Sequence, residues 1–227
     1  MRPPATVHPS SDAVEPFGAE YFGSVYRDYA AQNPPAKLAF YRRLAEHAVA
    51  GAVRPRVLEV GCGPGLFLGA LGPAWERFGT DVSDWAVGEA RRNVPGAVVE
   101  PSAAGAVPFD GLFDLVAAFD VLEHLPDPGA AVDALVRRLR PRGAMLAVVP
   151  VYDGPLGPLV RLLDRDSTHL QKRGRRFWLE LLGQELNVET WTGVFRYLMP
   201  WRTYIHLPAA ALRAVAPAVA ILARKDA

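Results

Sequence analysis

The sequence has little of three things: cysteine, net charge and uninterrupted apolar stretches. Cys62 is the single cysteine, so no intramolecular disulfide can form, and we expect a cytoplasmic protein. The formal net charge is +1, which gives no electrostatic reason to expect a nucleic-acid partner. The apolar stretch from Leu207 to Leu222 contains Arg213 and two prolines, and it is too short to cross a bilayer. We therefore expect a partner that is a small molecule, with no membrane and no nucleic acid.

The order of polar and apolar segments predicts an α/β fold. Residues 1–16 are rich in proline and serine and lack the apolar core of a signal peptide, so we expect a mobile N-terminus. Residues 17–50 are predicted to form an N-terminal helical cap of two helices, broken at Asn33-Pro34-Pro35. In residues 51–227, short apolar strands alternate with helices, which favours a mostly parallel sheet with helices on both faces. The predicted strands are 54–60, 75–82, 97–100, 113–119, 144–150, 188–195 and 218–223, and the main helices between them are 66–71, 84–93, 128–139 and 177–186.

A glycine-rich turn joins the first of these strands to its helix. Gly61, Gly63 and Gly65 allow positive φ angles and a close approach of the backbone to a ligand. A tight turn without a ligand is the alternative. The dinucleotide fingerprint has its third glycine at the sixth position, where this chain has Leu66. The spacing therefore predicts a cofactor site and counts against a nicotinamide-dependent oxidoreductase.

Two acidic residues frame the turn. Glu59 precedes it, and Asp81 ends the second predicted strand, where a carboxylate can accept hydrogen bonds from ribose hydroxyls or cap a helix. This pattern resembles motif I and the acidic loop of class I S-adenosylmethionine-dependent methyltransferases, whose signature is E/DxGxGxG. The resemblance continues through FDLVAAFDVLEHLPDP, residues 113–128, and is strongest between Arg56 and Pro150.

The resemblance implies a Rossmann-like class I methyltransferase fold with a seven-stranded, mostly parallel sheet and an antiparallel final pair. It also implies S-adenosyl-L-methionine as cofactor and methyl transfer to an O, N or C atom of a small molecule in bacterial secondary metabolism. A catalytically inactive methyltransferase-like binding subunit is the alternative. The residues predicted to bind the cofactor are Glu59, Gly61, Cys62, Gly63, Gly65, Asp81, Val82, Ser102, Ala103, Phe119, Asp120, Tyr21 and Tyr29.

The adenine end departs from the family pattern. Ala103 stands where an acidic residue is common, ahead of Val107-Pro108-Phe109. We expect the adenine amino group to meet Ser102, a backbone carbonyl or Glu100 instead. The faces of adenine need no charge, so the ring can stack between Val82 and Ala103.

His124 ends the sequence FDVLEH. It is a candidate general base or substrate contact, because an imidazole can accept a proton near neutral pH. A structural histidine that holds this loop is the alternative. Asp120, Glu123 and His124 also resemble the ExxEH metal cluster of quinone-ring O-methyltransferases. The first residue is Asp here and no fourth ligand is evident, so we expect no metal.

Residues 151–176 form a long polar segment after the fifth predicted strand, and we expect a substrate-binding insertion there. His169 is the second candidate base, with Asp166 predicted to orient it. In the alternative, Asp166 or Ser167 caps a helix and His169 is exposed. The basic residues from Lys172 to Arg176 form either a solvated face or a site for a carboxylate or phosphate.

Aromatic residues gather at both ends of the chain. Tyr21 and Tyr29 either pack in the core or bind the carboxylate of the cofactor. Aromatic residues of the C-terminal half predict a wall for an apolar or aromatic acceptor, in a monomer or homodimer. These are Trp178, Trp191, Phe195, Tyr197, Trp201, Tyr204 and His206.

Overall fold

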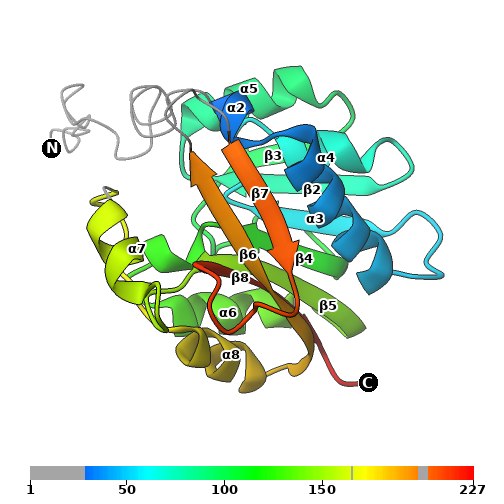
Figure 1. Cartoon of the computed structure of the whole chain (residues 1–227). Helices are drawn as coiled ribbons and strands as arrows, with labels where there is room; N and C mark the ends of the chain where they lie inside the picture. The colour runs from blue at the N-terminus through cyan, green and yellow to red at the C-terminus, as the bar shows by residue number, and fades with distance from the viewer. Residues whose placement is uncertain (1–28, 165, 199–203) are drawn as a thin grey trace, which may run out of the picture.

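The computed structural model describes residues 29–164, 166–198 and 204–227, which form one sheet covered by helices on both faces (Figure 1). The strands are β1 Arg56–Val60, β2 Glu76–Asp81, β3 Val98–Pro101, β4 Phe113–Phe119, β5 Leu139–Pro150, β6 Asn187–Leu198, β7 Tyr204–Ala209 and β8 Ala218–Arg224. The helices are α2 Tyr29–Gln32, α3 Pro35–Ala48, α4 Leu66–Leu71, α5 Asp84–Asn93, η1 Leu122–His124, α6 Pro128–Arg137, α7 Gly157–Leu163 and α8 Arg175–Gly183.

The strand order in the described sheet is β3-β2-β1-β4-β5-β8-β6-β7. β1 pairs in parallel with both β2 and β4, so the order reverses at β1. β8, β6 and β7 continue the sheet with antiparallel pairing. Ligands of open α/β sheets bind outside the carboxyl ends of the strands at such a reversal, and the glycine turn follows β1 at that point. The predicted Rossmann-like fold is confirmed.

The sheet has eight strands in the described residues, whereas seven were expected. The additional strand is β7, which contains Pro208 and lacks an alternating pattern. β7 lies at the edge of the sheet, where a proline is tolerated because its missing N–H is not needed for the next strand. The helix α7 was also missed, since its leucines are exposed and show no core-facing stripe.

The core has two layers, one on each face of the sheet. Alternate side chains of β4 point to opposite faces: Leu115 packs in the layer under α3, α4 and α5, and Val116 packs in the layer under α6 and α8. The central strands are buried on both faces, which explains their nearly continuous apolar sequence. Residues 1–28 lie outside the described residues, and with them the predicted mobile N-terminus and most of the first predicted helix.

Side-chain caps fix the starts of two helices near the site. The hydroxyl of Ser83 accepts a hydrogen bond from the N–H of Ala86 at the start of α5. Asp127 accepts one from the N–H of Ala130 at the start of α6. These caps therefore fix where the loop after β2 ends and α5 begins, and where the loop after η1 ends and α6 begins.

The hairpin of β6 and β7 extends beyond β8. Pairing of β6 with β8 ends at Val194, whereas pairing with β7 continues to Leu198. β7 lies beside α3 (Figure 1), and the ring of His206 packs 5.4 Å from that of Phe40 and 5.6 Å from that of Tyr41. The hairpin thus brings C-terminal residues next to α3, near the start of the described chain. Among the described residues, no helix has the length and apolar character needed to cross a membrane.

Candidate functional site

The glycine turn leaves no space for a larger residue at Gly61 or Gly65. Gly61, Gly63 and Gly65 have φ angles of 64°, 50° and 81°, in the left-handed region. A Cβ atom on Gly61 would lie 2.3 Å from Cγ2 of Val121, which follows β4. The thiol of Cys62 is buried, and burial raises its pKa, so it is a packing group rather than a nucleophile.

Asp81 braces this turn from the end of β2. One carboxylate oxygen accepts a hydrogen bond of 2.9 Å from the N–H of Gly63, and the other accepts one of 3.0 Å from the N–H of Ser83. Burial raises the pKa of Asp81, and these backbone donors oppose the rise. Each carboxylate oxygen keeps a further lone pair, so Asp81 can accept hydrogen bonds from a ligand in addition.

Glu59 presents a buried oxygen without a partner. Its side chain ends in the core, and Oε2 has no hydrogen-bond partner among the described residues. Burial and then the charge of Asp81 raise the pKa of Glu59. A buried polar atom without a partner is costly, and the side chain of Glu59 borders a cavity.

That cavity lies between α3 and the glycine turn. It is lined by Tyr29, Asn33, Lys37, Leu38, Tyr41, Glu59, Gly61, Cys62, Leu66, Phe67, Phe119 and Asp120. Lys37 is 7% exposed, and its ammonium group lies 3.4 Å from the carbonyl oxygen of Gln32 and over the rings of Tyr41 and Tyr204. Burial lowers the pKa of Lys37 to about 8. The structure places the predicted Tyr29 here, while Tyr21 lies outside the described residues.

Phe119 and Asp120 form the opposite wall. The ring of Phe119 stacks on that of Tyr41 at 4.2 Å. Asp120 has a φ angle of 57°, which is strained for a residue other than glycine, and its carboxylate lies 2.5 Å from the guanidinium of Arg196. Burial alone would raise the pKa of Asp120, but Arg196 and then Lys37 outweigh it and lower the pKa.

The residues predicted to contact adenine directly follow the carboxyl ends of β2 and β3. Val82 is 54% exposed and Ala103 is also exposed, so both can face a planar ring. Ser102 donates its hydroxyl proton to the carbonyl oxygen of Ala106 at 2.5 Å, and its N–H donates to the carbonyl oxygen of Asp81. Glu100 pairs with Arg91 at the surface.

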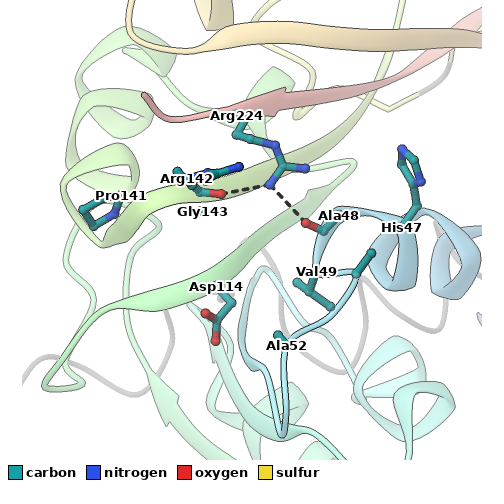
Figure 2. Close-up of a pocket in the computed structure, with 10 residues that line it drawn as sticks. His47, Ala48, Val49, Ala52, Asp114, Pro141, Arg142, Gly143 and Arg224 are labelled. Carbon is teal, nitrogen blue, oxygen red and sulfur yellow. Dashed lines mark hydrogen bonds between the residues drawn. The ribbon is translucent and has the colours of Figure 1, made fainter. Parts of the chain in front are cut away.

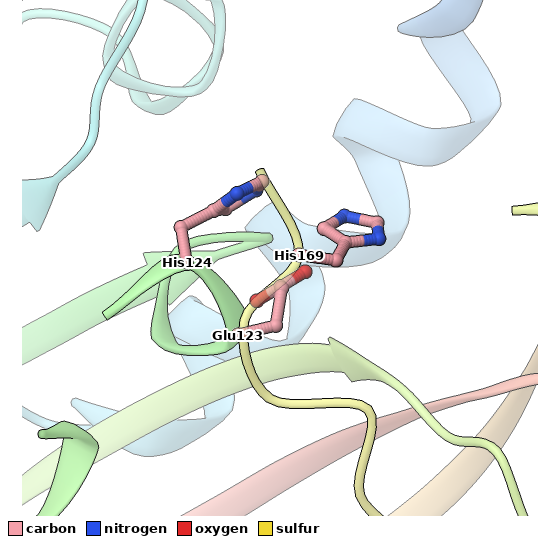
Figure 3. Close-up of side chains that lie close together, drawn as sticks. All are labelled: Glu123, His124 and His169. Carbon is pink, nitrogen blue, oxygen red and sulfur yellow. The ribbon is translucent and has the colours of Figure 1, made fainter. Parts of the chain in front are cut away.

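A second cluster of side chains lies at η1 (Figure 3). One ligand atom from each of Glu123, His124 and His169 lies within 4.8 Å of the others. The structure thus brings the two predicted catalytic histidines together, with ring centroids 4.7 Å apart. Burial and then the charge of His169 lower the pKa of His124.

Glu123 is fully buried, and both carboxylate oxygens lack a partner among the described residues. Burial and then the charge of Asp120 raise its pKa. Imidazole and carboxylate groups so close together can hold a divalent ion such as Zn²⁺. These three candidate ligands differ from the trio considered in the sequence analysis. Asp120 forms an ion pair with Arg196 instead, and His169 lies beside Glu123 and His124.

The nearest carboxylate to His169 is that of Asp164, and the predicted Asp166 lies farther away, beside the other ring nitrogen. Nδ1 of His169 lies 2.9 Å from a carboxylate oxygen of Asp164, whereas Nε2 lies 3.8 Å from Asp166. The alternative is wrong: the side chain of His169 is only 15% exposed, and no helix begins at Asp166 or Ser167.

The basic residues after His169 have partners within the chain. Lys172 pairs with Asp164, Arg175 with Asp153 and Arg176 with Glu180, and Arg173 packs over a ring. Of the C-terminal aromatic residues, Trp178 is buried in the core, while Tyr204 contacts Lys37 and His206 packs on α3. Trp201 lies outside the described residues, as does the side chain of Tyr197.

A family model described as "Methyltransferase domain" matches residues 27–192, well over half of the chain and all of the site except parts of the β6–β7 hairpin. The chain belongs to the methyltransferase domain family.

Two curated relatives of this chain carry the same name, "Ubiquinone biosynthesis O-methyltransferase". The protein of Aromatoleum aromaticum is 37% identical over 101 residues, which are 41% of this chain and 43% of that protein. The protein of Psychrobacter arcticus is 34% identical over 153 residues, which are 58% of this chain and 56% of that protein. The chain therefore spans about half the length of these curated relatives.

A solved structure supports the fold of this chain. The N-methyltransferase NodS from Bradyrhizobium japonicum, in complex with S-adenosyl-L-homocysteine, superposes with a TM-score of 0.61. The match covers 90% of this chain and 97% of NodS at 18% identity.

Figure 2 shows a second groove, lined by the end of α3, the first residues of β4 and β5 and the last residue of β8. Its volume is about 490 Å³. Arg224 donates hydrogen bonds there to the carbonyl oxygens of Ala48 and Arg142. Asp114 pairs with Arg140. Because these charged groups already have partners, the groove does not share the features of the site at the glycine turn.

Proposed function

We propose that this chain transfers a methyl group from S-adenosyl-L-methionine to an O, N or C atom of a small-molecule acceptor. The observation that carries the proposal is the glycine turn after β1, with Glu59 and Asp81 beside it and no room for a Cβ atom at Gly61. Membership of the methyltransferase domain family and the printed names of the relatives support it.

Residues on both sides of the turn would hold the cofactor. Asp81 would accept hydrogen bonds from the ribose, and Glu59, Gly61 and Cys62 would border the methionine part. Val82, Ser102 and Ala103 would surround the adenine. When bound, the cofactor supplies a methyl group that its positively charged sulfur activates.

Lys37 is a cofactor-binding residue that the sequence did not reveal. Its buried ammonium group and the guanidinium of Arg196 lie near one carboxylate, that of Asp120, so these three groups together carry one net positive charge. A carboxylate of the ligand would compensate this charge. We assign Lys37 and Tyr29 to the methionine carboxylate.

The acceptor would bind between η1 and the insertion at residues 151–176, near His124 and His169. An apolar or aromatic acceptor is the proposal, because the rings of Tyr41, Phe119 and Tyr204 lie at or beside the cofactor cavity, next to which the acceptor must bind. The chain's own contribution is then to align the acceptor, exclude water and remove its proton. We further propose residues 17–50 as the cap, residues 51–227 as the methyltransferase domain, and a cytoplasmic monomer or homodimer in bacterial secondary metabolism.

Isothermal titration of the purified chain tests the proposal with S-adenosyl-L-methionine, S-adenosyl-L-homocysteine and NAD. We expect micromolar binding of the first two and no binding of NAD. Binding of NAD alone would sink the proposal. Formation of S-adenosyl-L-homocysteine in an acceptor screen then separates an enzyme from an inactive binding subunit.

A further inference from the structure

Helix α7 exposes a face made of leucines. Leu159, Leu162 and Leu163 are separated by three and four positions, so they lie on the same side of the helix. All three are exposed, Leu162 at 78%, and Leu170 in the loop after the helix is exposed as well. These four residues form the leucine surface. Gly157 is the one buried residue of α7, so the helix contributes little to the core.

Other groups hold α7 against the rest of the chain. The guanidinium of Arg161 donates a hydrogen bond of 3.2 Å to the carbonyl oxygen of Lys172 and lies 5.4 Å over the ring of Tyr152. The hydroxyl of Tyr152 donates a hydrogen bond of 2.7 Å to Asp164, which follows the last residue of the helix. The leucine surface is therefore not needed to anchor the helix, and a contiguous exposed apolar surface is typical of an interaction site.

Positive charge surrounds the leucine surface. Residues 157–176 contain six basic and two acidic residues, a formal net charge of +4, whereas the whole chain carries +1. The side chains of the two acidic residues are only 7% and 10% exposed. The basic residues Arg161, Arg173 and Arg176 are exposed, so the charge that a partner meets on this surface is positive.

Ion pairs remove only part of this charge. Arg175 pairs with Asp153, and Arg176 pairs with Glu180 through an exposed contact. When these two acidic partners are included, an excess of two positive charges remains. Arg173 contributes to this excess, because it contacts an aromatic ring and an amide oxygen, neither of which carries a charge.

We propose that the leucine surface and the basic residues around it form a docking surface for an anionic membrane, with α7 lying in the plane of the interface. The leucines enter the boundary between the head groups and the acyl chains, and the arginines contact the anionic head groups. A second copy of this chain fits this surface less well, because a symmetric contact would bring two surfaces of equal positive charge together. The inference goes beyond the proposed function.

The expectation of a chain without a membrane partner is revised by this proposal. That expectation rested on the lack of a spanning segment and on the low net charge of the whole chain. A helix that lies in the interface needs neither a spanning length nor a high overall charge, because one apolar face and nearby basic residues are sufficient.

The docking surface is continuous with the acceptor region. The N–H groups of Leu170 and Gln171 both donate hydrogen bonds of 2.9 Å to the carbonyl oxygen of Glu123 in η1. An apolar acceptor dissolved in the bilayer would thus reach the site without crossing water, a consequence that rests on the proposed function.

Co-sedimentation of the full chain with lipid vesicles tests the proposal. The two vesicle compositions are phosphatidylcholine alone and phosphatidylcholine with about 30% phosphatidylglycerol. We expect binding to be about 10-fold tighter to the anionic vesicles, and to weaken about 10-fold when NaCl is raised from about 0.05 M to about 0.5 M. Absence of binding to the anionic vesicles would overturn the proposal.

A pair of leucine variants tests the apolar contribution. Leu162→Asn combined with Leu163→Asn should weaken binding to the anionic vesicles by about 10-fold. The matched control is Leu207→Asn combined with Leu212→Asn, two leucines of comparable exposure outside the leucine surface, which should bind as the wild type does. Equal losses in the two double variants would contradict the assignment to α7.

A pair of arginine variants tests the charge. Arg173→Gln combined with Arg176→Gln should weaken binding to the anionic vesicles by about 10-fold. The matched control is Arg42→Gln combined with Arg43→Gln on α3, where Arg42 forms the same four-residue ion pair with a glutamate as Arg176 does. If the control lost as much affinity, the attraction would be unspecific and the docking surface would be refuted.

Sedimentation equilibrium without vesicles decides between a membrane and a second copy. We expect the wild type and the leucine double variant of α7 to have the same mass. A dimeric wild type and a monomeric variant would make the leucine surface a contact between copies, which overturns the proposal.

Titration of the wild type with S-adenosyl-L-homocysteine separates this inference from the proposed function. Vesicle binding without binding of S-adenosyl-L-homocysteine would refute the methyl-transfer function and support the docking surface. Binding of S-adenosyl-L-homocysteine without vesicle binding would do the reverse.

Discussion

On the side of the site formed by β1, β2 and β4, backbone groups make the decisive contacts. The N–H groups of Gly63 and Ser83 meet Asp81, and the backbone at Gly61 passes close to Val121. On the side formed by η1 and residues 164–172, side chains make them, as between Asp164 and His169. We therefore expect the two sides to respond differently to substitution. Around the glycine turn, substitutions act by disturbing the backbone conformation, whereas around η1 and residues 164–172 they act by removing side-chain hydrogen bonds and charges.

The largest effect is expected from Gly61→Val on the backbone side. The strained φ and the overlap with Val121 together cost several kcal/mol, so binding of S-adenosyl-L-homocysteine should fall by more than about 100-fold. Isothermal titration measures it. Gly51→Ala is the control, because Gly51 has a φ of 87° but nothing within 4 Å of a Cβ atom. Wild-type affinity of the valine variant would contradict the close packing.

The next largest effect is expected from Asp81→Ala. Two backbone N–H groups lose their acceptor and the ribose loses its partner, which should weaken S-adenosyl-L-homocysteine by roughly 10- to 100-fold. Titration against Asp84→Ala, an exposed neighbour at the start of α5, provides the comparison. Equal affinities of the two variants would remove Asp81 from the site.

A third prediction concerns Lys37, whose charged side chain lines the cavity beside the glycine turn. Lys37→Met should weaken S-adenosyl-L-homocysteine by about 10-fold and leave 5′-methylthioadenosine, which lacks the amino-acid part, unchanged. Arg42→Met, an exposed position on the same helix, should change neither. Equal losses for both ligands would assign Lys37 a purely structural role.

The pH dependence of the same pair of ligands sharpens this prediction. The pKa of Lys37 is lowered to about 8, so its charge is lost as pH rises through that value. The preference of the wild type for S-adenosyl-L-homocysteine over 5′-methylthioadenosine should therefore decline more steeply between pH 7 and pH 9 than that of Lys37→Met. Parallel pH profiles would show that another group titrates.

The smallest effect is expected from His206 on the β6–β7 hairpin. Burial lowers its pKa from 6.5 to about 4, so the folded state binds fewer protons than the unfolded chain between these values. Stability should fall as pH falls from about 6.5 to 4, and His206→Phe should reduce that loss without changing cofactor affinity at pH 7.5. Thermal unfolding across this range measures it, and an unchanged acid sensitivity would exclude His206 as a contributor.

The glycine turn and the strands around it could be predicted from the sequence, because their conformation is determined by residues close together in the chain. The glycine turn and the strands around it are specified by residues that lie within a few positions of one another, and β1, β4 and α5 were placed within two residues at each end. Asp81 was found for the same reason, since it ends a strand beside the turn.

On the side formed by η1 and residues 164–172, His124 and His169 were predicted as candidates, but their partners were not, because only the fold decides which side chains meet. Lys37 is one of many lysines and arginines until the fold buries it, and nothing near Asp164 distinguishes it from Asp166 as the partner of His169. Likewise β7, with its proline and irregular pattern, becomes a strand only because β6 offers it an edge.

The ion pair of Asp120 and Arg196 joins positions 76 residues apart. A buried carboxylate that loses its guanidinium is costly, so the two positions are expected to change together during evolution. Relatives that carry a neutral residue at position 196 should carry asparagine or glycine at position 120, since both tolerate its positive φ. An alignment of relatives would then record the contact as a correlated pair, and exchange of the β6–β7 hairpin between family members should include position 120.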